Sequence, residues 1–221
     1  MDITKYLDTW AAAYRNDLIE NIMPFWMKFG LDRKHGGIYT CLDRDGKLMD
    51  STKSVWFQGR FGFIASYAYN HIEKKQEWLA ASKSCIDFIE THCTDIDGHL
   101  FFEVTEEGIP LRKRRYVFSE CFAAIAMSEY AIASGGKSYA TKALEMFKRI
   151  LKFLSTPGFL EPKYLPTLQS RGHSITMILI NTASRIREVI EDPVLDRQIN
   201  ESLTSIRQYF MHPEFKALLE M

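Results

Sequence analysis

Arg60 is the residue with the most restricted chemistry in this sequence. It lies near the start of an apolar segment, after Trp56 and Gln58. Its guanidinium group stays charged in a protein and presents five hydrogen-bond donors in a fixed fork. We therefore expect Arg60 to face an anionic or oxygen-rich group. For a single arginine that group is more often a surface carboxylate than a ligand, and the segment alone leaves both possibilities open.

An internal repeat places further polar residues in equivalent positions. Residues 35–40 align with residues 97–102 at an offset of 62 positions, and Gln58 aligns with Glu120 at the same offset. In both units a short alternating segment precedes a turn that contains glycine, which readily adopts the positive φ of such turns. Each unit is therefore predicted to contain a helix, a β-hairpin and a second helix.

The periodicity of apolar residues predicts about seven helices. Three of them are apolar on nearly all sides, which is typical of inner helices, and these are expected at 53–71, 117–134 and 172–190. Three have a charged side and are predicted to lie outside, at 74–92, 138–155 and 194–211. The remaining helix, at 2–22, is amphipathic, and Pro24 is expected to bend or end it.

Outer and inner helices alternate strictly along the chain, and a hairpin leads from each outer helix to the next inner one. In the third unit a loop over 157–172 with several Pro and Gly residues replaces the hairpin. This order predicts an all-α fold, an α/α toroid, as a single domain over 1–221. The inner helices should all begin at one mouth of the toroid.

That mouth is the candidate binding site for a polar small molecule. The residues with suitable chemistry near the inner helix starts are Trp56, Gln58, Arg60, Tyr116, Ser119, Glu120 and His173. No two histidines are three or four positions apart, so we expect no metal site. The glycine pairs belong to turns and not to a phosphate-binding loop, and no cofactor is expected.

The bulk composition argues against several classes of partner. Lys plus Arg and Asp plus Glu number 28 each, so no net field attracts nucleic acid or anionic lipid. Residues 1–30 carry too many charges for a signal peptide or a membrane span. The four cysteines show no C-x-x-C pairing and are expected to be reduced thiols. We therefore expect a cytoplasmic protein.

Three motifs together resemble the N-acylglucosamine 2-epimerase family, which includes renin-binding proteins. They are the segments 36–46, 56–60 and 118–122. The resemblance implies an (α/α)6 toroid whose central cavity interconverts N-acetylglucosamine and N-acetylmannosamine through an enediolate, in a homodimer. It also implies that Arg60 stabilises the developing oxygen charge. His173 stands where sugar isomerases and disaccharide epimerases of the superfamily keep a histidine near the substrate.

The resemblance further implies that the chain corresponds to the N-terminal portion of the toroid. In this family the two histidines that exchange the carbon-2 proton lie in the second half of a chain nearly twice as long. We therefore expect residues 1–221 alone to lack epimerase turnover. Trp56 and Tyr116 offer rings for stacking on a sugar, although aromatic residues at helical spacing more often belong to a core.

Alternative functions stay open at this point. A related aldose–ketose isomerase or disaccharide 2-epimerase would use the same intermediate. A toroidal glycoside hydrolase or lyase would need two opposed carboxylates, for which Glu120 with Glu103 or Glu161 are the candidates. A non-catalytic protein that binds a sugar or a protein partner is the third possibility.

Overall fold

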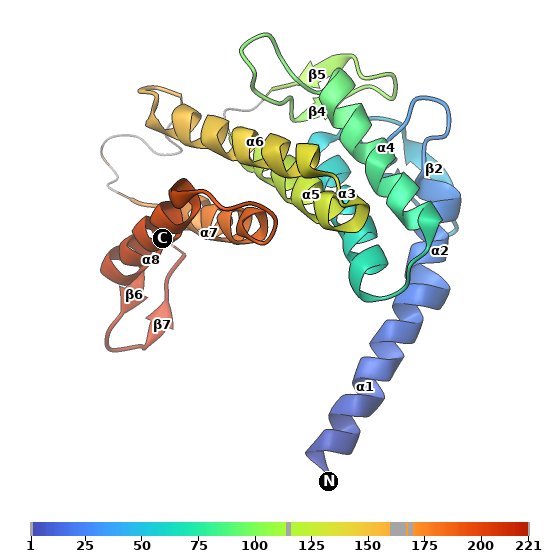
Figure 1. The fold of residues 1–221 in the computed structure, drawn as a ribbon, viewed down its shortest axis with the longest axis horizontal. Helices are drawn as coiled ribbons and strands as arrows, with labels where there is room; N and C mark the ends of the chain where they lie inside the picture. The colour runs from blue at the N-terminus through green and yellow to red at the C-terminus, as the bar shows by residue number, and fades with distance from the viewer. Residues whose placement is uncertain (1, 114–115, 160–166, 168–169, 221) are drawn as a thin grey trace.

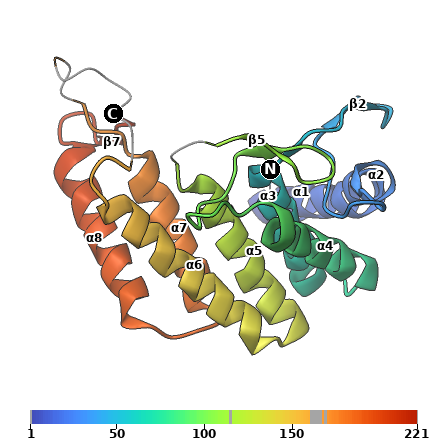
Figure 2. The same ribbon diagram turned by 90° about the horizontal axis from the view of Figure 1, so that it is seen from above.

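The computed structural model describes residues 2–113, 116–159, 167 and 170–220. Helices form two layers (Figures 1 and 2). The inner layer contains α3 (Val55–His71), α5 (Phe118–Ser134) and α7 (Ser174–Arg187), and the outer layer contains α4 (Gln76–His92), α6 (Lys137–Ser155) and α8 (Pro193–Tyr209). The α5 helix lies in the middle, because it packs against α3 and α7 within its layer and against α6 outside. The predicted alternation of inner and outer helices is confirmed.

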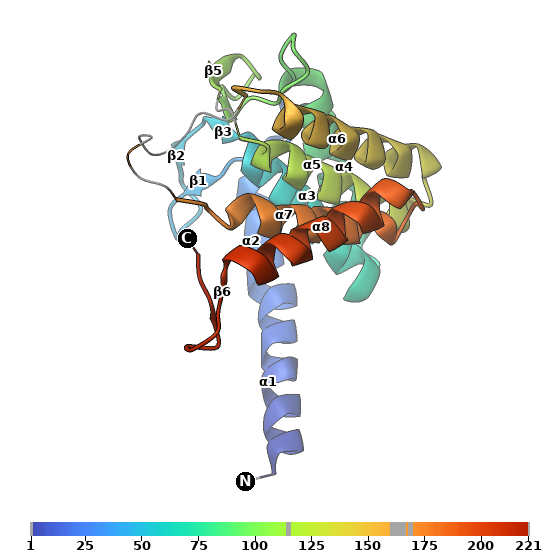
Figure 3. The ribbon, with the colours of Figure 1, turned by 90° about the vertical axis from the view of Figure 1, so that its left-hand side faces the viewer.

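The N-terminal helix is longer than predicted and projects from the two layers (Figures 1 and 3). After α1 (Ile3–Asp17), helical backbone continues through a π-helical turn (Leu18–Ile22), α2 (Met23–Phe25) and a second π-helical turn (Trp26–Gly30). The expectation that Pro24 ends the helix is wrong, because helical backbone continues through this residue, which lies in α2 between the two π-helical turns. No residue of α1 is buried, so its apolar side has no cover within the described chain.

Short strands connect the outer helices to the inner ones. The first hairpin pairs β1 (Cys41–Leu42) with β2 (Leu48–Asp50), and the second pairs β4 (Glu103–Val104) with β5 (Pro110–Arg112). The strand β3 (Lys53–Ser54) pairs with β4 and thereby joins the two repeat units in one sheet. The turn glycines Gly46 and Gly108 have φ of 87° and 94°, as predicted.

In the C-terminal region, one segment differs from the prediction and another lies largely outside the described residues. A small hairpin of β6 (Met211–His212) and β7 (Ala217–Leu218) follows α8, where the sequence predicted helix to residue 211. The loop predicted over 157–172 lies largely outside the described residues.

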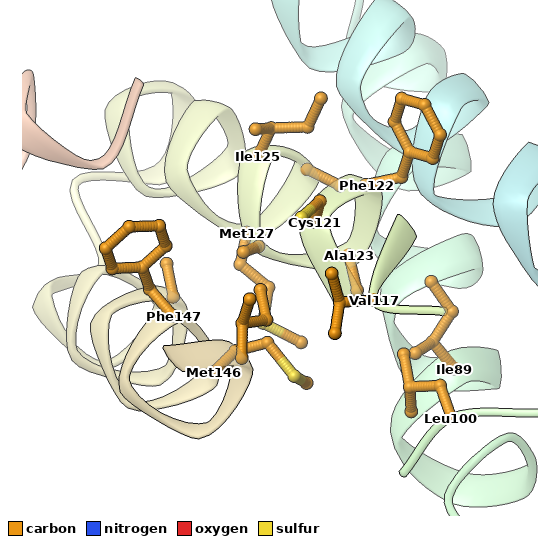
Figure 4. Packing of buried hydrophobic residues seen from close by; sticks show 14 of the residues in the cluster. Ile89, Leu100, Val117, Cys121, Phe122, Ala123, Ile125, Met127, Met146 and Phe147 are labelled. Carbon is orange, nitrogen blue, oxygen red and sulfur yellow. The ribbon is translucent and has the colours of Figure 1, made fainter. Parts of the chain in front are cut away.

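The hydrophobic core surrounds α5. Val117, Cys121 and Ala123 are fully buried there, against Leu100 of the second hairpin region and Phe147 of α6 (Figure 4). Nearly every position of α5 is buried, including polar ones. This explains why its sequence lacks a polar side, since every face meets another element.

Gly59 allows α3 to approach α5 closely, and Gly59→Ala should therefore destabilise the protein. A Cβ at this position would lie 2.6 Å from the backbone carbonyl carbon of Phe122. Alanine favours a helix by about 1 kcal/mol over glycine, but forced separation of two packed helices costs roughly 1–3 kcal/mol. We expect a net loss of about 1 kcal/mol in the free energy of unfolding, measured by urea denaturation.

The matched control for this prediction is Gly172→Ala, because a Cβ at Gly172 meets no atom within 4 Å. We expect that variant to unfold with the wild-type midpoint. A Gly59→Ala protein more stable than wild type would show that helix propensity outweighs the close helix contact.

Candidate functional site

Arg60 lies on the exposed side of α3. Its guanidinium carbon is 4.7 Å from the ring centre of Phe122 on α5, within the range of a cation–π interaction. Other arginines pair with carboxylates, for example Arg187 with Asp196 at 2.6 Å. Among the described residues, no carboxylate forms an ion pair with Arg60, so the alternative of a surface ion pair is not found. The arginine is a cation whose donors are open to solvent.

Trp56 lies one helical turn before Arg60 and contacts the same phenylalanine. Its ring is 5.6 Å from that of Phe122 in an edge contact, and it stacks on Phe118 at 5.2 Å. Phe102, which precedes β4, supplies a third ring at 5.7 Å. Trp56 therefore belongs to an aromatic cluster between the starts of α3 and α5 and holds the surface from which Arg60 projects.

Gln58 and Glu120 support the hairpins and do not face open space, which differs from the prediction that they contact a substrate. Gln58 is fully buried; its Oε1 accepts the N–H of Ile38 at 2.8 Å and its Nε2 donates to the Ile38 carbonyl at 2.7 Å. Glu120 is equally buried, and its Oε1 accepts the N–H of Leu100 at 2.7 Å. Ile38 and Leu100 are again 62 positions apart, so the repeat extends to these hydrogen bonds.

His99 is a polar residue of the core. It is 1% exposed, and its Nδ1 contacts Glu120 Oε1. The rings of Phe153 and Phe159 meet the imidazole edge-on at 5.3 and 5.1 Å. The other carboxylate oxygen of Glu120 is buried without a hydrogen bond to any described residue. The pair is enclosed in the core, so its role in this structure is to anchor the second hairpin.

The remaining predicted residues lie at or just before the starts of α5 and α7. Ser119 is 3% exposed, and Tyr116 is partly buried just before α5. His173 precedes α7, and its ring packs edge-on against Phe210 at 5.4 Å. Its backbone N–H donates to the Glu220 carbonyl. The two helices that carry Arg60 and His173 flank α5 on opposite sides, and no hydrogen bond or ring contact joins these side chains in the described chain.

A hollow of about 410 Å³ lies elsewhere, between the turn before the first hairpin and α4. Its walls include His35, Lys83, Asp87 and His92, and Arg60 does not line it. This hollow is therefore a different place from the mouth predicted at the inner helix starts. Arg60 faces the open side of the inner layer.

A buried ammonium group is the feature that sequence reasoning missed. Lys53 is fully buried, and its Nζ donates to Asp32 Oδ2 at 2.7 Å and to the carbonyls of Gly36 and Glu106 at 2.8 Å each. Burial raises the pKa of Asp32, but the hydrogen bond from Lys53 and two backbone N–H groups outweigh it and lower the pKa to about 2. The only signal in the sequence is a lysine before an apolar helix, which equally describes a surface residue.

Two predictions made from the composition concern the cysteines and membrane-spanning helices. Burial raises the pKa of Cys85, Cys93 and Cys121, so these cysteines pack as small hydrophobic residues, as expected for Cys85 and Cys121. Within the described residues, none of the helices combines the length and the apolar character that crossing a bilayer requires.

Comparison with known proteins gives one consistent family. Residues 37–214 match the family model described as N-acylglucosamine 2-epimerase (GlcNAc 2-epimerase). The N-acylglucosamine 2-epimerase of Rattus norvegicus is 30% identical over 192 residues, which are 84% of this chain and 46% of that protein. The cellobiose 2-epimerase of Ruminococcus albus is 31% identical over 143 residues, which are 64% of this chain and 36% of that protein. The chain thus spans about half the length, or less, of these relatives.

A solved structure of a sugar epimerase has a similar fold. The structure of cellobiose 2-epimerase from Bacillus thermoamylovorans B4167 superposes with a TM-score of 0.84 and 20% sequence identity, over 96% of this chain and 58% of that chain. At this identity the likeness shows the fold alone. The predicted fold class, an α/α toroid present in part, is confirmed.

Proposed function

This chain belongs to the N-acylglucosamine 2-epimerase family, and from that premise we propose that it carries part of a site, within one domain, that epimerises a reducing sugar at carbon 2. The proposed pair is N-acetylglucosamine and N-acetylmannosamine. The observation that carries the proposal is the guanidinium of Arg60, which forms no ion pair with a described residue and is held over Phe122 beside the aromatic cluster of Trp56. A cation that no described carboxylate neutralises is suited to bind an anionic intermediate.

Arg60 would act on the charge that develops during proton abstraction. Removing the carbon-2 proton of an open-chain aldose places negative charge on the carbonyl oxygen and gives an enolate, which is an enediolate when carbon 2 carries a hydroxyl group. A fixed donor aimed at that oxygen lowers the barrier by about 3 kcal/mol. Returning a proton to the opposite face inverts carbon 2. Histidine suits both transfers because its pKa lies near neutrality, and His173 is the candidate in this chain.

Two alternatives within the same chemistry differ in substrate. The similarity to cellobiose 2-epimerase supports a disaccharide substrate, and an aldose–ketose isomerase would form the same enediolate. The hydrolase alternative has less support, because Glu120 is buried as a hairpin anchor and Glu103 is 3.7 Å from Arg112. Glu161 lies outside the described residues.

The proposed partners and location rest on the composition of the chain and on exposed apolar side chains of α3. The α3 side chains Phe57, Ile64 and Tyr67 are exposed next to Arg60, so the open side of the inner layer suits a cover of further toroid helices or a second chain. We propose a homodimer. Equal numbers of acidic and basic residues favour neither nucleic acid nor anionic membranes as partners, and the free thiols suit the cytoplasm.

The proposed function predicts hydrogen exchange at one carbon. We expect a complete toroid that contains this chain, incubated with N-acetylmannosamine in D2O, to introduce deuterium at carbon 2 and to form N-acetylglucosamine, measured by proton NMR. Residues 1–221 alone should show no exchange. Exchange with cellobiose or mannose only would favour the alternative substrates, release of a cleaved sugar would favour a hydrolase, and a sugar-dependent thermal shift without exchange would indicate a binding protein.

A further inference from the structure

Two turns from different repeat units meet at one point on the hairpin side of the molecule. His35 lies in the turn before the first hairpin, and Glu106 and Glu107 lie in the turn of the second hairpin. One ligand atom from each of the three side chains lies within 4.8 Å of the other two. His35 and Glu106 are partly buried and Glu107 is exposed.

The backbone of both turns is held by the same buried group. Lys53 Nζ donates to the carbonyls of Gly36 and Glu106 at 2.8 Å each, and to Asp32 Oδ2 at 2.7 Å. The other oxygen of Asp32 accepts the N–H of His35 at 3.0 Å. The positions of His35 and Glu106 are therefore set before any ligand binds, which reduces the entropic cost of binding.

The side chains themselves have unsatisfied or oriented ligand atoms. Nε2 of His35 is shielded from solvent and forms no hydrogen bond with a described residue, a situation that costs about 1–3 kcal/mol for a buried polar group. Tyr39 donates its hydroxyl to Glu106 Oε2 at 3.0 Å, and such outer hydrogen bonds orient ligating carboxylates.

We propose that His35, Glu106 and Glu107 bind one divalent transition-metal ion, with Zn²⁺ as the best fit. One imidazole nitrogen and two carboxylate oxygens form a donor set that suits Zn²⁺ and disfavours Mg²⁺ and Ca²⁺, which prefer oxygen ligands alone. Tetrahedral coordination needs ligand atoms roughly 3.4 Å apart, so the three side chains would close in on the ion from the 4.8 Å within which their ligand atoms lie. A water molecule would complete the four ligands.

This proposal departs from the expectation of no metal site, which rested on spacing along the chain. His35 and Glu106 are far apart in sequence, and only the packing of the two turns brings them together. The bound ion would link the hairpins that lead into α3 and α5. It does not depend on the proposed epimerisation, because Arg60 is not part of the donor set.

The test is calorimetric titration of Zn²⁺ into chelator-treated protein that carries Cys41→Ser, because Cys41 is an exposed thiol. We expect one equivalent to bind, and we expect His35→Gln, Glu106→Gln and Glu107→Gln each to weaken the affinity at least tenfold. The unfolding midpoint should rise with Zn²⁺ only when all three ligands are present. Co²⁺ in place of Zn²⁺ should give the visible absorption of a tetrahedral site.

The control is the double variant Glu188→Gln with Glu191→Gln, two exposed carboxylates after α7, which should bind Zn²⁺ like the parent. Glu107→Gln keeps the test decisive if the partly buried variants do not fold, because its side chain is exposed. Equal affinity of parent and Glu107→Gln, an equal loss in the control, or no saturable binding would each overturn the proposal.

Discussion

Replacing Arg60 by alanine is expected to lower kcat/KM for N-acetylmannosamine epimerisation by about a hundred- to a thousandfold in a complete toroid that contains this chain. The reason is the loss of donors to an oxygen whose charge develops only in the transition state, an effect of about 3–4 kcal/mol in comparable oxyanion sites. The measurement is the initial rate of N-acetylglucosamine formation. Thermal stability should be almost unchanged, because the side chain is exposed and contacts Phe122 only through its cation.

Two further variants separate charge from geometry. Arg60→Lys keeps the positive charge but loses the planar fork, and we expect an intermediate rate. Arg187→Ala removes an exposed arginine that pairs with Asp196 on the far helices, and it should leave kcat/KM at the wild-type value. An Arg60→Ala enzyme with the wild-type rate would refute the proposed role of this residue.

Replacing Lys53 by methionine should cost about 3–5 kcal/mol of unfolding free energy at pH 7, the largest stability effect we predict. Breaking a buried ion pair by removing one partner leaves the other charge uncompensated. Here the Asp32 carboxylate would stay buried, and the carbonyls of Gly36 and Glu106 would also lose their donor. The measurement is urea denaturation followed by circular dichroism.

The double variant Asp32→Asn with Lys53→Met tests the cause, because it removes the stranded charge and should recover part of the loss. A Lys53→Met protein within 1 kcal/mol of wild type, on the scale of surface substitutions, would contradict a dominant role for the pair.

The same pair predicts a pH dependence. The pKa of Asp32 is lowered from 3.8 to about 2 in the folded protein, so its ionised form contributes roughly 2 kcal/mol above pH 4. This contribution is lost as the pH falls through the folded value near 2. Wild-type stability should therefore fall between about pH 4 and pH 2 more steeply than that of Asp32→Asn, when both are followed by urea denaturation at each pH.

The sequence by itself determined the order of inner and outer helices and the equivalence of the two hairpin units. Both are encoded by residues close together along the chain: apolar periodicity decides which side of a helix is buried, and a turn glycine such as Gly46 decides where a hairpin reverses. The repeat even anticipated that Gln58 and Glu120 are equivalent, since both bind the hairpin backbone of their own unit.

Only the tertiary structure decided where the polar side chains at the helix starts point. Gln58 and Arg60 are two positions apart on α3, yet one is buried against Ile38 and the other is exposed over Phe122. Likewise, Lys53 reaches Asp32 and Glu106 only because its strand β3 pairs with the second hairpin and the turn before the first hairpin folds against it. Such contacts join residues far apart in the chain and depend on desolvation in the folded core, which no local pattern of residue types records.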